Sequence, residues 1–270
     1  MKKLYYVIMF LPLLIMSCGE DGISNFNVFP ISDDIKLGQQ LDAEIKKSPA
    51  EYPIYNNSSI QSYLNNILAE IIASPEIKYK NEFNYNLTII RNDSVINAFA
   101  TPGGYIYVYT GLLRFVDSKA ELASIIAHEV AHAERRHATT RMTKLYGVNI
   151  LLGLVLGNNP SQLEQIAANL FTNLGVLKNS RDDEYEADEY AFKYLRTTPY
   201  YPGAMMEFFG RIESLGGSSQ NSLTVLLSTH PLGEDRVNAV KELIKKYNPA
   251  APSEANMFVS EYAQQVKNKL

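Results

Sequence analysis

Ala127-His128-Glu129-Val130-Ala131-His132 spells the pattern HExxH inside a run with helical character. Two histidines four residues apart lie about 40° apart around a helix axis and one turn apart along it, so both imidazoles can reach one metal ion. Glu129 lies about 100° from His128, beside that ion. Zinc takes imidazole ligands tetrahedrally, and a glutamate in this place can accept the proton of an activated water. The stretch predicts a zinc site, although a solvated helix face can carry the same letters by chance.

The helix that carries this motif has a start signal of its own. Ser118-Lys119-Ala120-Glu121 predicts a capping box, in which the Ser118 hydroxyl accepts from the Glu121 backbone N–H and the Glu121 side chain reaches back. We therefore expect a buried helix that begins near Ser118. Its apolar stripe recurs at three- and four-residue spacing and consists of Leu122, Ile125, Ile126, Val130 and Ala133.

The residues just after the motif narrow the class of site. His137 lies five residues after His132, about 140° further round the helix, so we expect it to be a structural residue or to support the ligands rather than to bind the metal. A longer zinc signature requires a glycine three residues after the second histidine and a third histidine three residues further on. Arg135 and Ala138 occupy those positions, which disfavours that class.

Length, composition and charge bound the remaining possibilities. A chain of 270 residues with 46% hydrophobic residues suits one sizeable domain with appendages. The formal net charge of −4 gives no electrostatic case for nucleic-acid binding, so we exclude nucleic acid as a partner.

The N-terminus has the pattern of a secretory signal. Met1-Lys2-Lys3 is followed by an apolar run over residues 4–16 that is too short to span a bilayer as a mature helix. The run ends at Ile15-Met16-Ser17-Cys18, which resembles a bacterial lipoprotein signal with Cys18 as the lipidated first residue. Cys18 is the only cysteine, so no intramolecular disulfide can form. The alternative is an ordinary signal peptide with an incidental cysteine; in both cases the mature protein leaves the cytoplasm.

Short elements precede the metal helix. Helical spacing predicts helices over residues 33–47 and 58–73, and alternation predicts a strand over residues 83–90. Residues 95–100 and 105–110 predict two further strands around Thr101-Pro102-Gly103-Gly104, whose glycines permit a tight reversal. This small antiparallel sheet can present an edge that binds an extended peptide, or it is a plain structural hairpin.

Beyond the metal helix, a Leu/Gly-rich segment over residues 148–156 is too interrupted to span a membrane, and a helix is expected from about Ser161. An acidic helix then follows Ser180. Its Glu184 and Asp188 share one face and Glu186 lies roughly opposite. Because HExxH supplies two ligands, one of these carboxylates can bind zinc while another orients a ligand histidine. The alternative is a solvated acidic face.

Taken together, these motifs resemble those of the HtpX- and BepA-like zinc metallopeptidases, the family that includes the CAAX prenyl proteases. The resemblance covers residues 31–246, and four motifs in one order are far more specific than HExxH alone. The four are Asn97 to Tyr105, then Glu121-Leu122-Ala123 with HEVAH, then Ser180-Arg181 with Glu184 and Ala187-Asp188, then Thr229-His230-Pro231 with Arg236.

The resemblance implies roles for residues outside HExxH. It implies Glu184 as the third ligand of one zinc ion per chain, beside His128 and His132, and Asp188 as the aspartate that supports the ligands. It places His230 near the zinc, either on the open position in a latent state or as a group that stabilises the reacting oxyanion. It makes Arg236 an anchor for that loop, with a surface arginine as the alternative.

The expected protein is α+β, a mostly helical domain with a small antiparallel sheet beside the HExxH helix. We expect Glu129 to act as general base and the strand edge with Asn97, Ala98, Phe99 and Ala100 to align a polypeptide substrate. The predicted divisions are a signal peptide (1–17), a tether (18–30), the metallopeptidase domain (31–249) and a C-terminal linker with one short helix (250–270).

The predicted function is zinc-dependent endopeptidase activity in the bacterial cell envelope, on misfolded or unassembled envelope proteins. A lipid on Cys18 would hold the protein to a membrane, facing the periplasm or the exterior. The membrane-embedded helices of the HtpX and prenyl-protease branches and the tetratricopeptide repeats of BepA are missing, so a prenylated substrate is not expected. The alternative is a latent or weakly active lipid-anchored chaperone that holds envelope proteins in the same groove.

Overall fold

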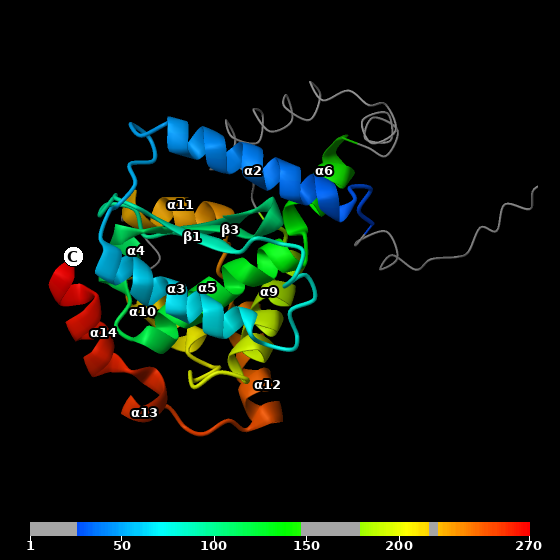
Figure 1. The fold of residues 1–270 in the computed structure, drawn as a ribbon. Helices are drawn as coiled ribbons and strands as arrows, with labels where there is room; N and C mark the ends of the chain where they lie inside the picture. Colours follow the sequence, from blue (N-terminus) through cyan, green and yellow to red (C-terminus); the bar gives the residue numbers. More distant parts are fainter. Residues whose placement is uncertain (1–25, 147–178, 216–220) are drawn as a thin grey trace, which may run out of the picture.

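The computed structural model describes residues 26–146, 179–215 and 221–270. Cys18, the predicted signal peptide, the apolar segment 148–156 and the helix expected from Ser161 lie outside these residues. Figure 1 shows a small sheet enclosed by helices. The expected α+β class with few strands and many helices is confirmed.

The sheet has three strands, β1 (Asn86–Ile90), β2 (Ala98–Thr101) and β3 (Tyr105–Tyr109), in the order β1-β3-β2. The expected hairpin is present: β2 pairs antiparallel with β3 through the 3₁₀ turn η1 (Pro102–Gly104). The sheet differs from the expectation in one respect, because β1 pairs with β3 in parallel and the sheet is mixed.

The burial of β3 explains this order. Alternate residues of a strand point to opposite faces, and here both faces are covered: Tyr105 and Tyr107 pack on one side, Ile106 and Val108 on the other. A strand buried on both faces takes the central position.

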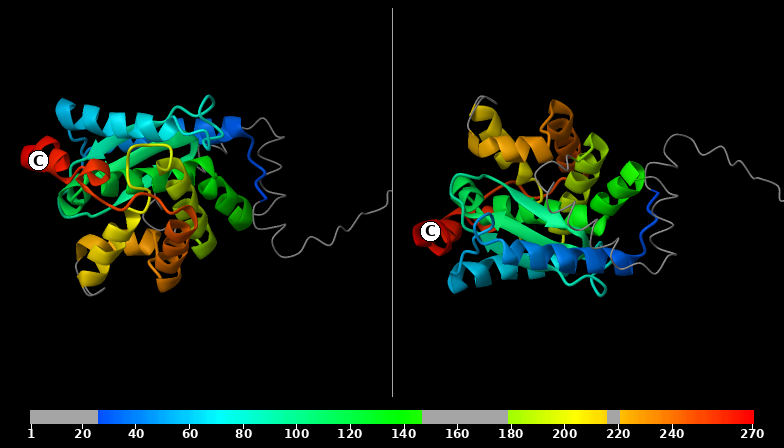
Figure 2. Two further views of the ribbon diagram at one scale, coloured as in Figure 1. Left: turned by 90° about the horizontal axis from the view of Figure 1, so that it is seen from below. Right: turned by 90° about the horizontal axis from the view of Figure 1, so that it is seen from above.

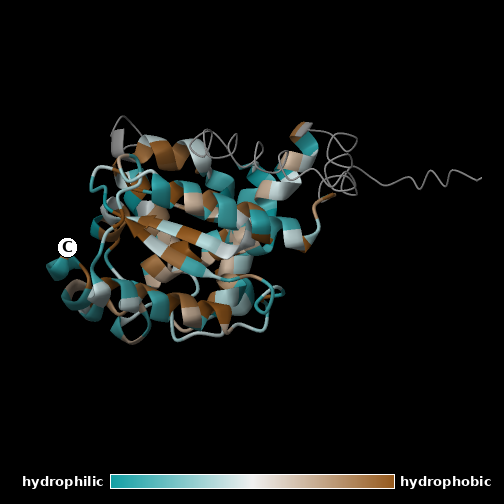
Figure 3. Ribbon diagram, turned by 45° about the horizontal axis from the view of Figure 1, so that its top comes forward, coloured by the Kyte–Doolittle hydropathy of each residue, from teal (hydrophilic) through white to brown (hydrophobic). Residues whose placement is uncertain are grey.

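Helices form a layer on each side of the sheet. Helix α2 (Ile31–Lys47) lies over the face with Tyr105 and Tyr107, and Ile45 packs against that face. Helices α3 (Ser58–Ile72) and α5 (Lys119–Glu134) cover the opposite face, as Figures 1 and 2 show. In Figure 3, hydrophobic residues run along the sheet, and hydrophilic and hydrophobic residues alternate along the surrounding helices.

Helix α5 is the predicted metal helix. It follows the short helix α4 (Thr110–Phe115), and the Ser118 side chain caps it by accepting from the Glu121 backbone N–H at 3.0 Å. The Glu121 carboxylate does not return to Ser118; it accepts from the Asp117 N–H at 2.8 Å and from Arg211 at 3.2 Å. Every residue from Ala120 to Glu134 is buried, which confirms the expected buried helix.

The second half of the chain packs around α5. Helix α9 (Arg181–Leu195) packs along α5, α12 (Glu234–Tyr247) packs along α9, and α10 (Met205–Ser214) contacts both α5 and α12. No helix among the described residues is long and apolar enough to cross a bilayer. Helix α6 (His137–Tyr146) follows α5, and helix α11 (Asn221–Thr229) precedes α12.

The two ends of the described chain are more closely integrated than the predicted divisions suggest. Phe29, in the predicted tether, is buried, and the Asn27 amide donates to Thr139 of α6 at 2.8 Å. The C-terminal residues form α13 (Glu254–Met257), α14 (Val259–Gln265) and the 3₁₀ turn η2 (Lys267–Lys269) instead of a linker with one helix. Tyr262 of α14 is fully buried and donates to the Leu113 carbonyl at 2.7 Å.

Candidate metal centre

Four buried side chains converge at the C-terminal half of α5. His128, His132, Glu184 and His230 each offer one ligand atom, and these atoms all lie within 4.8 Å of one another. The Nε2 atoms of the two α5 histidines are 2.9 Å apart. Glu184 Oε1 lies 3.2 Å from His132 Nε2, and its Oε2 lies 3.4 Å from His128 Nε2. The structure therefore brings together the two HExxH histidines and the glutamate that the resemblance indicated.

The start of α9 fixes the position of Glu184. The Ser180 hydroxyl accepts from the Asp183 N–H at 3.1 Å, and the Asp183 carboxylate accepts from the Ser180 N–H at 3.0 Å, which completes a capping box. Glu184 is the next residue and is fully buried against α5. Glu186 points elsewhere and pairs with Arg135 at 2.8 Å.

Asp188 of α9 and Arg236 of α12 contact the ligand cluster and hold its side chains in place. Asp188 Oδ1 lies 2.8 Å from His128 Nδ1, so the imidazole is held with its Nε2 toward Glu184. The Arg236 guanidinium donates to both Asp188 oxygens at 2.7 and 2.8 Å, and a third nitrogen lies 2.7 Å from Glu184 Oε2. Arg236 also donates to the Pro231 carbonyl at 3.2 Å, next to His230. The arginine is buried and joins this loop to α9 instead of lying on the surface.

The charges in this cluster are strongly coupled. Burial by itself would lower the pKa of His128, but hydrogen bonds to Asp188 and Glu184 outweigh burial and raise that pKa to about 10. Burial and the charge on His128 hold the pKa of His132 well below its ordinary value. Burial would raise the pKa of Glu184, but the neighbouring His230 and His128 hold it well below the ordinary value. The two carboxylates thus favour positive charge at this place, which a bound cation would also supply.

His230 connects the cluster to Glu129. His230, which follows α11, lies with Nδ1 3.1 Å from Glu184 Oε1 and 3.4 Å from His128 Nε2. Its other nitrogen, Nε2, lies 3.5 Å from Glu129 Oε1. The imidazole thus bridges the predicted ligands and the predicted general base.

His137, expected to support the site, contacts a predicted ligand directly. Its Nδ1 lies 2.7 Å from His132 Nδ1, and its Nε2 lies 3.0 Å from Glu186 Oε2. Asn179 was not predicted at all, yet its amide nitrogen lies 3.3 Å from His132 Nε2 and 3.3 Å from His230 Nδ1. The one sequence signal for Asn179 is its place directly before the cap of the helix that carries Glu184.

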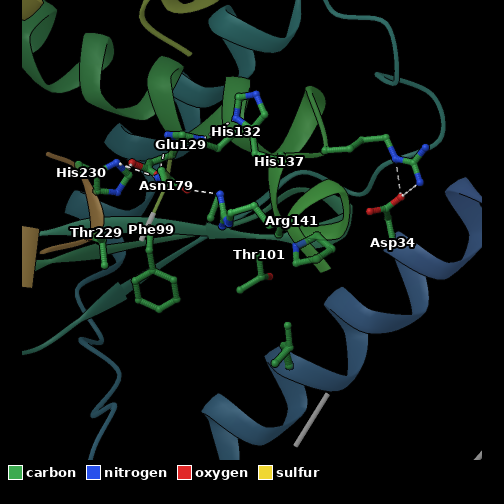
Figure 4. A pocket seen from close by; sticks show the side chains of 16 residues that line it. Asp34, Phe99, Thr101, Glu129, His132, His137, Arg141, Asn179, Thr229 and His230 are labelled. Carbon is green, nitrogen blue, oxygen red and sulfur yellow. Dashed lines mark hydrogen bonds and ion pairs between the residues drawn. The ribbon is translucent and has the colours of Figure 1, made fainter. Parts of the chain in front are cut away.

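Two cavities meet at Glu129 and His230. The first, shown in Figure 4, is called the polar cleft because most of its lining residues are polar or charged; they include Asn179 and residues of α5, α6 and β2. The second is mostly apolar and extends toward α10 and α11; its apolar lining is Ala98, Ile125, Met205, Phe208, Phe209, Ile212, Leu226, Leu227 and Leu232. Among the described residues, Glu129 and His230 are the two that line both cavities.

Strand β2 passes along both cavities. Ala98 lines the apolar cavity, whereas Phe99 and Ala100 line the polar cleft. As the outer strand of the sheet, β2 has one edge that no strand of the described ranges covers. Asn97, the fourth residue of the predicted substrate edge, is buried, gives its carbonyl to the Tyr109 N–H at 3.1 Å and lines neither cavity.

The donor set fits zinc. Two imidazole nitrogens and one carboxylate are the protein ligands of many catalytic zinc sites, which leave one position open for water or substrate. Here the three donors are buried and already within a few ångströms of each other. Two of them also contact a further group, since His128 Nδ1 lies 2.8 Å from Asp188 and His132 Nδ1 lies 2.7 Å from His137.

Comparison with known proteins supports the resemblance to zinc metallopeptidases. The model of "Peptidase family M48" matches residues 58–244, well over half of the chain. The putative beta-barrel assembly-enhancing protease of Vibrio cholerae is 29% identical over 227 residues, which cover 80% of this chain and 46% of that protein. The beta-barrel assembly-enhancing protease of Escherichia coli K12 is 26% identical over 246 residues, which cover 88% and 49%. The chain thus spans about half the length of these two relatives.

A third relative has a length closer to this chain. Metalloprotease LoiP of Escherichia coli K12 is 24% identical over 230 residues, which cover 82% of each protein. The resemblance inferred from the motifs is confirmed, and this chain belongs to peptidase family M48.

Proposed function

We propose that this protein is a zinc-dependent endopeptidase that cleaves misfolded or unassembled proteins of the bacterial cell envelope. The names of its relatives, which include beta-barrel assembly-enhancing proteases and a metalloprotease, support this proposal. In the proposal, a lipid on Cys18 holds the protein to a membrane, and the folded domain faces the periplasm or the exterior.

Each residue of the site has a part in this proposal. His128, His132 and Glu184 would hold one zinc ion, which would supply a Lewis acid for the scissile carbonyl and for the attacking water. Glu129 accepts the proton of the attacking water and passes it to the leaving amine, a contribution of about 10²- to 10⁴-fold. Asp188 holds the orientation of His128 at 2.8 Å, and Arg236 holds Asp188.

The main observation behind the proposal is that Glu129 and His230 lie where the two cavities meet and line both of them. A peptide that lies along the open edge of β2 crosses both cavities, so its backbone passes the general base. Main-chain hydrogen bonds to a strand edge hold an extended peptide without requiring one sequence, which suits a protease that acts on unfolded chains.

A second candidate function rests on the position of His230. Its Nδ1 lies among the ligand atoms, 3.1 Å from Glu184 and 3.4 Å from His128. As a fourth zinc ligand, His230 would fill the open position, and the protein would then be a latent protease or a chaperone that holds envelope proteins in the cleft.

One experiment separates these functions: zinc content and degradation of casein, measured for wild type, Glu129→Gln and His230→Ala. The peptidase is supported if Glu129→Gln keeps zinc and loses about 10²-fold or more of the wild-type rate. A rate that rises in His230→Ala indicates a latent enzyme, and a rate that falls indicates a catalytic histidine. Zinc in all three proteins with no cleavage by any of them would contradict the proposed peptidase and favour the chaperone.

A further inference from the structure

The amide of Asn179 reaches the metal site from the wall of the polar cleft. Asn179 is 7% exposed, and its backbone N–H donates to the Thr229 carbonyl at 3.1 Å, which fixes it beside His230. Figure 4 shows the side chain between His230 and Arg141, with contacts to both. No motif considered above includes this residue.

Arg141 determines which way the amide faces. A guanidinium has hydrogen-bond donors only, so the atom of Asn179 that it contacts must be the carbonyl oxygen Oδ1. The NH₂ group consequently points away from Arg141, to within 3.3 Å of both His132 Nε2 and His230 Nδ1. Arg141 is itself tied to the start of α9, 3.5 Å from Asp183 Oδ2.

This orientation excludes Asn179 as a metal ligand and makes it a donor. A planar amide nitrogen has no free lone pair for a cation, and the amide oxygen, which could bind one, is occupied by Arg141. The lone pair of His132 Nε2 serves the metal when zinc is bound, and His230 Nδ1 can donate to Glu184 at 3.1 Å. The buried NH₂ group then lacks an acceptor, a state that proteins avoid.

We infer that the Asn179 amide donates a hydrogen bond to the carbonyl oxygen of the scissile peptide bond, and that Arg141 is the positioning residue that orients it. The inference rests on the proposed peptidase function and adds a catalytic residue to that site. Negative charge develops on this oxygen as water attacks, so a donor fixed in advance stabilises the transition state more than the bound substrate.

The first test is Asn179→Ala, assayed with an unstructured peptide substrate. We expect kcat to fall about 10²-fold while KM changes less than about threefold, because a donor that acts in the transition state affects kcat. Zinc affinity, measured by competition with a chelating dye, should stay within about threefold of wild type. A parallel loss of zinc affinity, or an effect on KM alone, would show a structural role and overturn the inference.

Arg141 offers a matched pair of variants. Lysine has donors only, so Arg141→Lys should keep the amide orientation and leave kcat within about threefold of wild type. Glutamine can donate or accept, so Arg141→Gln no longer selects one orientation, and kcat should fall about 10-fold. In the Asn179→Ala background, Arg141→Gln should have no further effect on kcat. If Arg141→Gln lowers kcat by the same factor in wild type and in Asn179→Ala, Arg141 does not act through Asn179, and its role as positioning residue is overturned.

A binding measurement tests the inference independently of turnover. A phosphinic peptide carries charged oxygens where the attacked carbonyl would be, so zinc-loaded wild type should bind it about 10- to 100-fold more tightly than zinc-loaded Asn179→Ala. Calorimetry gives both constants even if wild type cleaves nothing, so failure of the peptidase proposal and failure of this inference are distinguishable. Equal affinities, or no binding by wild type, would overturn the inference.

Discussion

The Nδ1 atoms of His132 and His137 lie 2.7 Å apart at the end of helix α5. A histidine that binds a metal through Nε2 carries its proton on Nδ1, so His132 donates to His137 in this arrangement. His137 can then donate from Nε2 to Glu186, 3.0 Å away. This chain of hydrogen bonds orients the ring of the second HExxH histidine.

Replacing His137 should therefore weaken zinc binding. Partners of this kind typically contribute 10- to 100-fold to metal affinity, so we expect His137→Phe to lower zinc affinity by about that factor. Glu186→Gln is the matched control, because its amide oxygen still accepts from His137 and zinc affinity should change less than about threefold. Competition with a chelating dye measures both, and wild-type affinity in His137→Phe would contradict this role.

The apolar cavity should determine which bonds are cleaved. A peptide antiparallel to β2 runs from the side of Ala100 toward Ala98, so the residue on the carboxyl side of the scissile bond enters the cavity lined by Phe208 and Leu227. We expect kcat/KM for peptides with leucine or phenylalanine there to exceed that for aspartate by about 10-fold or more. A peptide library with mass-spectrometric product identification measures this preference.

A change in the cavity wall should shift the preference. Leu227→Lys should raise the relative rate for aspartate at that position by about 10-fold, whereas Leu145→Lys, a like change at an exposed site on α6, should leave the preference unchanged. Cleavage without any preference on the carboxyl side, or a preference confined to the amino side, would contradict this orientation of the substrate.

The buried Arg236 should be important for stability as well as for the site. Replacement by methionine leaves Asp188 and Glu184 buried without their arginine partner, a change that typically costs about 3–5 kcal/mol. Urea unfolding of metal-free wild type and Arg236→Met measures the difference in the free energy of unfolding. Arg236→Lys should lose less, since it keeps the charge, and a loss below about 1 kcal/mol in Arg236→Met would contradict the account.

Local signals in the sequence were sufficient for the helix that carries HExxH. The Ser118 cap and the period of the apolar residues depend on neighbours within a few positions, and both are present in α5. The turn at Gly103 and Gly104 is equally local, because both residues have positive φ. The strand order was not predictable in this way, since it depends on which strand is buried on both faces in the folded protein.

The residues of the site also divide into those that local sequence patterns predict and those that only the folded protein brings together. Spacing pairs His128 with His132, but the choice of Glu184 over Glu186 came from the resemblance to known metallopeptidases, since an acidic helix alone allows either face to be solvated. The contacts of Asn179 depend on three segments far apart in sequence, which bring Arg141, His230 and His132 around one amide. No pattern along the chain predicts such a meeting.

The most direct test of the account is anomalous diffraction at the zinc edge from crystals of the protein grown with zinc. The account predicts one peak per chain, about 2.0–2.2 Å from the Nε2 atoms of His128 and His132 and from a carboxylate oxygen of Glu184. A peak coordinated by other residues, or no peak within reach of the two histidines, would contradict it.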